Sequence, residues 1–106
     1  RSGSREAFDR DKLMRAVRNS VGKYFDSDLD VQSVVDQVEE LIYERGKDEI
    51  PSSLIGETIL EVLSDTNEMA YVRFASVFKE FKTLDDLERS IAEQRERMEK
   101  RKKEKE

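Results

Sequence analysis

The stretch Met69–Phe81, MAYVRFASVFKEF, carries the strongest structural signal in the chain. On a helix its apolar side chains fall three and four residues apart, which places them in one stripe that must be buried: Ala70, Phe74, Val77, Phe78 and Phe81. Tyr71, Arg73 and Ser76 bring polar groups to this aromatic wall. The pattern predicts a core helix. It could also close a pocket for a flat ligand, but periodicity alone favours plain packing.

Composition limits the fold and the chemistry. With 106 residues and 36% hydrophobic content, the chain can build one modest core. Charged residues make up 42% and there is a single Pro, which favours long exposed helices over an all-β fold. The absence of Cys and His excludes disulfides, a thiol nucleophile, a histidine base and the usual zinc sites from these residues. We therefore do not expect an enzyme.

No apolar run reaches the ~18 residues that a membrane-spanning helix needs, and no signal-peptide core is present. The sequence therefore predicts no membrane partner and a cytoplasmic location.

Charge is distributed unevenly along the chain. Residues 1–23, the basic island, carry seven basic and three acidic side chains, a net charge of +4. Residues 24–92 carry six basic and 17 acidic side chains, a net charge of -11. A basic island on an acidic domain can attract a compact anion such as a nucleoside triphosphate. A solvated helix face would explain the same charges, so charge alone does not decide.

The basic island also has a local structural pattern. Turn residues at positions 2–4 and a short strand through Glu6 to Phe8 predict the end of a tight β-hairpin. Asp9 is a suitable N-cap for a helix whose buried face holds Leu13, Val17, Val21 and Tyr24. Together the strand and the helix start would direct Arg1, Glu6, Asp9 and Lys12 toward one corner. Free N–H groups at a helix start, with cations nearby, suit an anion.

Three more helices are predicted. One carries an apolar stripe from Val31 to Ile42, is capped by Asp28 or Asp30, and ends near Gly46. The next follows a possible short strand at Ile50 before Pro51, is capped by Ser52 or Ser53, and includes Gly56, where a neighbouring backbone or a ligand would have to pack closely. The last starts near Leu84 with a capping box of Thr83 and Asp86. Beyond Ala92 the apolar pattern ends, which predicts an exposed, fraying helix.

The predicted fold class is therefore mainly α (α+β), a small helical bundle capped by a short β-hairpin or sheet. We expect residues 1–82 to form this domain and residues 83–106 to form a charged C-terminal helix or tail.

The chain resembles the ATP-cone domains, and in particular the cone of the bacterial transcriptional repressors of ribonucleotide reductase genes. The resemblance covers about residues 1–81. It rests on the order of hairpin turn, Glu6, Phe8, Asp9 and Lys12, then PSSLIGE at residues 51–57, then AYVRFASVFKEF at residues 70–81. It implies a domain that binds ATP or dATP, with Mg²⁺, as an allosteric signal without turning it over.

The resemblance also implies roles for individual residues. Arg1 would meet the phosphates, Glu6 and Asp9 would lie near the adenine amino group, and Lys12 would reach ribose and phosphate. Ser52 would line the phosphate side and Phe78 would close the pocket. The full set of implied nucleotide-binding residues is Arg1, Glu6, Phe8, Asp9, Lys12, Ser52 and Phe78.

Repressors of this family also carry an amino-terminal zinc ribbon with four cysteines, and these 106 residues contain no cysteine. We therefore expect zinc and promoter DNA to be bound only by such an upstream domain, and the cone to form a homo-oligomer. Phe78 stands where these repressors usually have tyrosine. Two alternatives remain: the regulatory cone of a ribonucleotide reductase catalytic subunit, and a helical protein-interaction module with no ligand.

Overall fold

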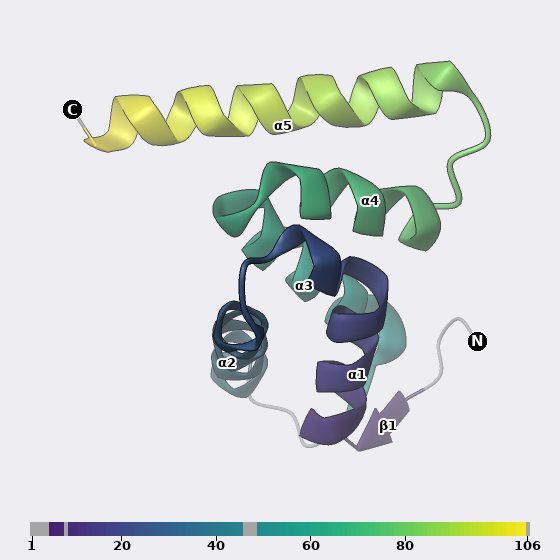
Figure 1. The fold of residues 1–106 in the computed structure, drawn as a ribbon, viewed down its shortest axis with the longest axis vertical. Coiled ribbons are helices and arrows are strands. Elements are labelled where there is room, and N and C mark those ends of the chain that lie inside the picture. Colours follow the sequence, from purple (N-terminus) through teal and green to yellow (C-terminus); the bar gives the residue numbers. More distant parts are fainter. Residues whose placement is uncertain (1–4, 8, 46–48, 106) are drawn as a thin grey trace.

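The computed structural model describes residues 5–7, 9–45 and 49–105, and most of them are helical (Figure 1). In chain order the elements are β1 (Arg5–Ala7), α1 (Arg10–Val21), the short 3-10 helix η1 (Gly22–Tyr24), α2 (Asp28–Glu44), β2 (Glu49–Pro51), α3 (Ser52–Thr66), α4 (Glu68–Phe78) and α5 (Leu84–Lys105).

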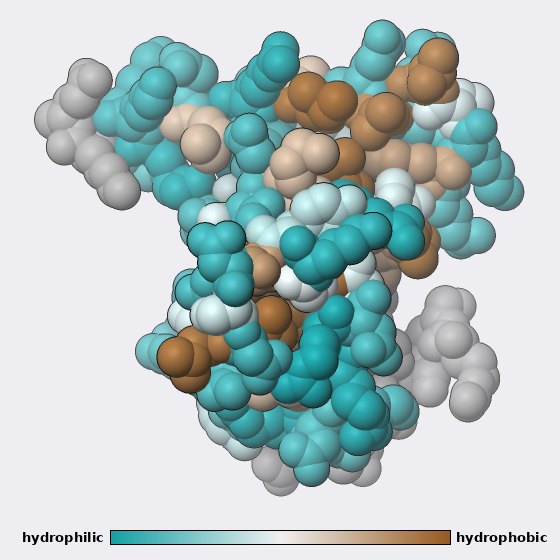
Figure 2. Space-filling model, in the orientation of Figure 1, coloured by the Kyte–Doolittle hydropathy of each residue, from teal (hydrophilic) through white to brown (hydrophobic). Residues whose placement is uncertain are grey.

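The core lies where α1, α2, α3 and α4 pack against one another. The predicted apolar stripes of α1 and α2 supply many of its residues. Several core residues have no exposed surface, among them Val17, Val21, Val34, Val35, Val38, Ile42 and Leu63. Burying each such side chain contributes about 1.5–3 kcal/mol relative to leaving it in water. The outer faces of α1 and α2 are mostly hydrophilic (Figure 2).

The predicted β-hairpin is wrong. β1 pairs with β2 in an antiparallel sheet, with Arg5 opposite Pro51, Glu6 opposite Ile50 and Ala7 opposite Glu49. A hairpin joins two neighbouring strands by a short turn, whereas β1 pairs with β2 across α1 and α2. The predicted turn at residues 2–4 lies outside the described residues. Each strand is only three residues long, so the described chain is helical overall rather than α+β.

The helix starts agree only in part with the predicted caps. Asp9 caps α1, and Thr83 with Asp86 forms the capping box at the start of α5, both as predicted. Ser27, rather than Asp28 or Asp30, caps α2 by accepting from Asp30 N. Pro51 occupies the N-cap position of α3, and its fixed φ suits a helix start.

The buried face of α4 differs from the predicted stripe. Val77 is 61% exposed, whereas Tyr71 is 1% exposed and Ala75 is fully buried. The physical reason is the position of α5, which packs against α4 and α3 and places the Arg97 guanidinium 5.8 Å from the centre of the Tyr71 ring. The buried side of α4 is therefore rotated toward α5.

Beyond Ala92, α5 is mostly exposed, as predicted, but it does not fray at this point: the helix continues to Lys105 and is docked through Gln94 and Arg101. α5 lies alongside α4 across one end of the bundle (Figure 1). Gln94 is 4% exposed and its Nε2 donates to the Ser64 carbonyl oxygen over 2.7 Å. Arg101 forms an ion pair with Asp65 at 3.1 Å. Apolar periodicity misses this helix because its contacts are largely polar.

None of the described helices is long and apolar enough to cross a bilayer.

Candidate functional site

The β1–β2 pairing brings together the segments that hold the predicted site residues. Glu6 lies opposite Ile50, and Ser52 begins α3 directly after β2. Asp9 and Lys12 follow the other end of β1, at the start of α1. Because the strands are antiparallel and span about 10 Å, the N-terminal ends of α1 and α3 flank the sheet at its opposite ends. An elongated anionic ligand could therefore meet both helix starts.

Asp9 and Lys12 are joined at the start of α1. The Asp9 carboxylate accepts a hydrogen bond from Lys12 N at 3.2 Å, which fixes the first turn of the helix. The Lys12 side chain is exposed to solvent. Free N–H groups of a first turn and a lysine ammonium both favour negative charge, so this end of α1 suits a phosphate group.

Phe78 forms an aromatic wall at the end of α4. Its ring is stacked on Phe74 with centroids 5.9 Å apart and an angle of 18° between the planes. The ring also lies against Gly56, one turn after Ser52 in α3. With 37% of its surface exposed, Phe78 is available to a ligand. The wall is therefore linked to the start of α3 by direct contact.

The end of α4 holds Phe78 in place. Phe81 N donates to the Ser76 carbonyl oxygen at 2.9 Å and Glu80 N donates to the Val77 carbonyl oxygen at 3.2 Å, the pattern of a Schellman motif. Glu80 occupies the left-handed position of this motif with φ of 54°. Phe81 then packs back against the core. Phe78 is thus the last residue of a helix whose end is well determined.

Of the seven predicted site residues, Arg1 and Phe8 lie outside the described residues. The backbone of Glu6 lies in β1, and Ser52 begins α3 directly after β2. Asp9 and Lys12 lie together at the start of α1. The Phe78 ring lies against Gly56, and this contact connects it with α3. Their roles toward a ligand remain predictions.

Arg10 and Arg18, which belong to the basic island, form ion pairs with acidic residues of α2. Arg10 binds Asp36 at 2.7 Å and Glu39 at 2.9 Å on α2. Arg18 binds both oxygens of Asp28 at 2.9 and 3.2 Å, and these hydrogen bonds, with one from Gln32, hold the pKa of the Asp28 carboxyl below its usual range. Arg10 and Arg18 therefore tie α1 to α2, and their charges are already compensated.

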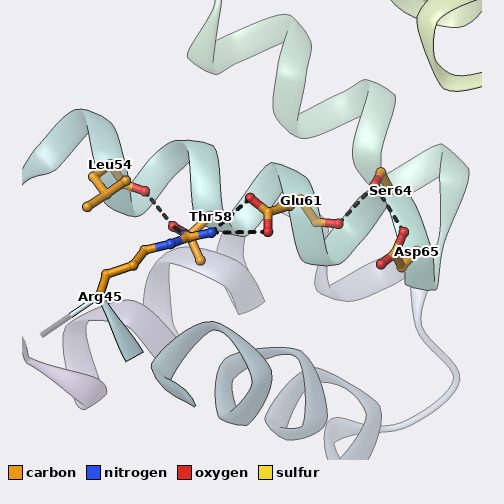
Figure 3. Close-up of polar contacts among 6 residues, drawn as sticks. All are labelled: Arg45, Leu54, Thr58, Glu61, Ser64 and Asp65. Carbon is orange, nitrogen blue, oxygen red and sulfur yellow. Dashed lines mark hydrogen bonds and ion pairs between the residues drawn. The ribbon is translucent and has the colours of Figure 1, made fainter. Parts of the chain in front are cut away.

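Sequence reasoning missed a polar cluster between the end of α2 and α3 (Figure 3). Arg45 Nη1 donates to Thr58 Oγ1 at 2.9 Å, and the Thr58 hydroxyl donates to the Leu54 carbonyl oxygen at 2.7 Å. Arg45 also reaches Glu61 at 3.3 Å. Thr58 is fully buried, so these contacts satisfy a hydroxyl in the core. The available signal was a threonine within the apolar stripe of α3.

No group of three or more acidic residues is arranged to hold a metal ion within the ranges 5–7, 9–45 and 49–105. The described residues place two helix starts, which favour anions, at the ends of a short sheet, and an aromatic ring against α3.

The sequence of the chain was also compared with known proteins. The chain is similar to proteins named Transcriptional repressor NrdR. One from Streptococcus equi subsp. zooepidemicus (strain MGCS10565) is 38% identical over 88 residues, 83% of this chain and 54% of that protein. One from Petrotoga mobilis (strain DSM 10674 / SJ95) is 41% identical over 93 residues, 88% of this chain and 62% of that protein.

A third relative of the same name, from Rhodococcus jostii (strain RHA1), is 42% identical over 102 residues, 95% of this chain and 66% of that protein. The chain thus spans between about half and two thirds of the length of these relatives. Residues 1–84 match the ATP cone domain family, and the chain belongs to that family.

Proposed function

We propose that this chain is the adenine-nucleotide-sensing domain of a transcriptional repressor of ribonucleotide reductase genes. The observation that carries the proposal is the match to the ATP cone domain over residues 1–84, together with relatives named as NrdR repressors. The names of these relatives favour a repressor over a reductase subunit. The proposed role is regulatory, with no catalytic step.

The corner around β1 and β2 is the proposed binding site for ATP or dATP with Mg²⁺. The Lys12 side chain would reach ribose and phosphate, with Ser52 and Arg1 on the phosphate side. Glu6 and Asp9 would accept hydrogen bonds from the adenine amino group, because a carboxylate is an acceptor. Phe78 and Phe8 would supply apolar surface to the nucleoside.

In this proposal the nucleotide controls association between copies of the chain, and association controls DNA binding. The DNA contacts would come from a part of the protein outside these 106 residues. A formal net charge of -5 disfavours contact with the phosphate backbone of DNA.

Calorimetry with ATP and with dATP tests the binding step. We expect saturable heat with both nucleotides, and a rise in melting temperature because a ligand that binds the folded state stabilises it. Phosphate release should stay at the rate of nucleotide alone. If millimolar nucleotide produces neither heat nor a thermal shift, the chain is not a nucleotide sensor.

A further inference from the structure

Gly56 is the residue on which the Phe78 ring rests. It lies in the second turn of α3 and is buried. A Cβ added to Gly56 would lie 2.8 Å from Cδ1 of Phe78 and still closer to Cε1 and Cζ. Real Cβ atoms essentially never approach other heavy atoms within 3.0 Å. The ring therefore fills the volume that any larger residue at position 56 would need.

The Phe78 ring has two contacts and one exposed side. Gly56 lies beneath it, Phe74 is stacked beside it, and its remaining surface is exposed. A hollow of about 300 Å³ adjoins it, lined in part by Glu57, Leu60 and Arg97. A ring pushed away from Gly56 therefore has room to move, so a side chain at position 56 would displace the ring rather than separate the two helices.

The glycine is unfavourable for the helix that contains it. A glycine inside a helix costs about 1 kcal/mol relative to alanine. Replacing Gly56 by alanine would recover this amount and lose packing between the ring and α3. The two changes oppose each other, so Gly56→Ala should leave the melting temperature nearly unchanged while it moves the ring.

We propose that Gly56 is a positioning residue that holds Phe78 at the wall of the nucleotide pocket and thereby sets the affinity for adenine nucleotides. This inference rests on the proposed function above. Gly56 does not itself contact the nucleotide. It fixes the distance between the aromatic ring and the start of α3, because Ser52 stands one turn earlier on the same helix.

A double-mutant cycle in the 106-residue chain tests the proposal. ATP affinity is measured by calorimetry for the wild type, Gly56→Ala, Phe78→Ala and the variant with both substitutions. We expect each single substitution to weaken binding about tenfold, which is the effect of losing one well-placed aromatic contact. The double variant should bind no more weakly than Phe78→Ala, because without the ring there is nothing to position.

Gly22→Ala is the matched control. Gly22 lies at the end of α1 with right-handed backbone angles, and a Cβ there would meet only Arg18 side-chain atoms at 3.5 and 4.0 Å, which is ordinary contact. This variant should bind ATP as the wild type does. Wild-type affinity in Gly56→Ala, or losses that multiply in the double variant, would overturn the proposal.

Nuclear magnetic resonance separates failure of this inference from failure of the proposed function. In the wild type, the Phe78 ring should shift the Gly56 Hα resonances and show cross-relaxation with them. In Gly56→Ala, the added methyl group stands between the backbone and the ring, so cross-relaxation between the ring and the Hα of residue 56 should be lost while the rest of the spectrum is retained. If the wild type binds no nucleotide, the proposed function fails. The positioning of the ring still stands if this contact is lost in Gly56→Ala, and it is wrong if the contact persists.

Discussion

Lys12 and Arg18 belong to the same helix and the same basic island, yet their surroundings differ. The Arg18 guanidinium forms two hydrogen bonds with Asp28, so its charge stabilises the junction of α1 and α2. Lys12 stands in the first turn of α1, beside the sheet. A diffuse electrostatic field would use both residues alike, whereas a pocket would use only Lys12.

We therefore expect Lys12→Ala, and likewise Glu6→Ala, to weaken nucleotide binding by about 1–3 kcal/mol, as for a charge-assisted contact. Arg18→Ala should change nucleotide affinity little. Calorimetry with ATP measures all three, and circular dichroism checks that each variant is folded. An equal loss of nucleotide affinity in all three variants would show that the basic island attracts the nucleotide by its overall charge and not through a pocket.

Glu80 carries backbone strain. It takes φ of 54° in the Schellman motif that ends α4, a region that a side chain with a Cβ occupies at a cost of about 1–2 kcal/mol. Glycine adopts this region freely, although it loses more entropy on folding. We expect Glu80→Gly to raise the free energy of unfolding by about 0.5–1 kcal/mol, measured by urea denaturation.

Glu80→Ala is the control for Glu80→Gly, because it removes the same charge and keeps the Cβ. It should not stabilise the chain. A gain equal to that of Glu80→Gly would show that charge, rather than backbone conformation, limits stability at this position.

At the scale of elements, α5 depends on its first turn. Asp86 accepts hydrogen bonds from Lys82 N at 2.9 Å and Thr83 N at 3.2 Å, and these bonds hold the pKa of its carboxyl below the usual value. Thr83 Oγ1 accepts from Asp86 N at 3.1 Å. The capping box therefore needs the ionised carboxylate.

A depressed pKa contributes stability that is present above the unfolded-state value of about 3.9 and is lost as the pH falls through the lower folded-state value. We expect Asp86→Asn to lower the melting temperature at pH 6. The variant and the wild type should converge toward pH 2. Thermal melts between pH 6 and 2 measure this, with Asp85→Asn in the same turn as the control. If the melting temperatures of the wild type and Asp86→Asn differ by the same amount at every pH, the ionised carboxylate is not the source of the stability.

Local rules predicted some elements well and could not predict others. Asp9 and the pair Thr83 and Asp86 were identified because a cap depends on residues within one turn. The docking of α5 through Gln94 was not predicted, because it depends on the carbonyl group of Ser64, which lies in α3, far away in the chain. Tyr71 is buried and Val77 is exposed for the same reason, because α5 covers the Tyr71 side of α4.

The candidate site was predicted in the same uneven way. Its residue types and the start of α1 follow from the sequence, but the pairing of β1 with β2 joins segments separated by two helices. Contact between Phe78 and Gly56 was foreseen only as close packing at a glycine. The division into residues 1–82 and 83–106 stays a prediction.

At the scale of the whole molecule, α4 connects the candidate site with the surface. Phe78 forms the wall, while Met69, Arg73 and Val77 on the same helix are exposed. Tyr71, on the same helix, is covered by α5 and is not available to a neighbouring copy. Arg73 remains the polar candidate for a contact between copies, and Figure 2 shows hydrophobic surface over the part of the molecule where α4 and α5 lie.

We expect the mean mass in sedimentation velocity to differ between ATP and dATP, because a coupling of about 1–3 kcal/mol suffices to redistribute oligomers. Arg73→Ala should reduce this difference and leave nucleotide affinity intact. Identical profiles for the chain alone, with ATP and with dATP would place any switch outside these residues.

The three residue pairs between β1 and β2 have a consequence for the order of folding. α3 and α4 are neighbours in the chain and pack against each other directly, whereas β1 must wait for the chain to close a loop that contains α1 and α2. Closing this loop lowers the conformational entropy of the chain, which is unfavourable. The short sheet is therefore expected to open before the helices do, and the candidate site would come apart while the bundle persists. A bound nucleotide would then slow amide hydrogen exchange most strongly at Glu6 and Ile50, and least in the core of α2.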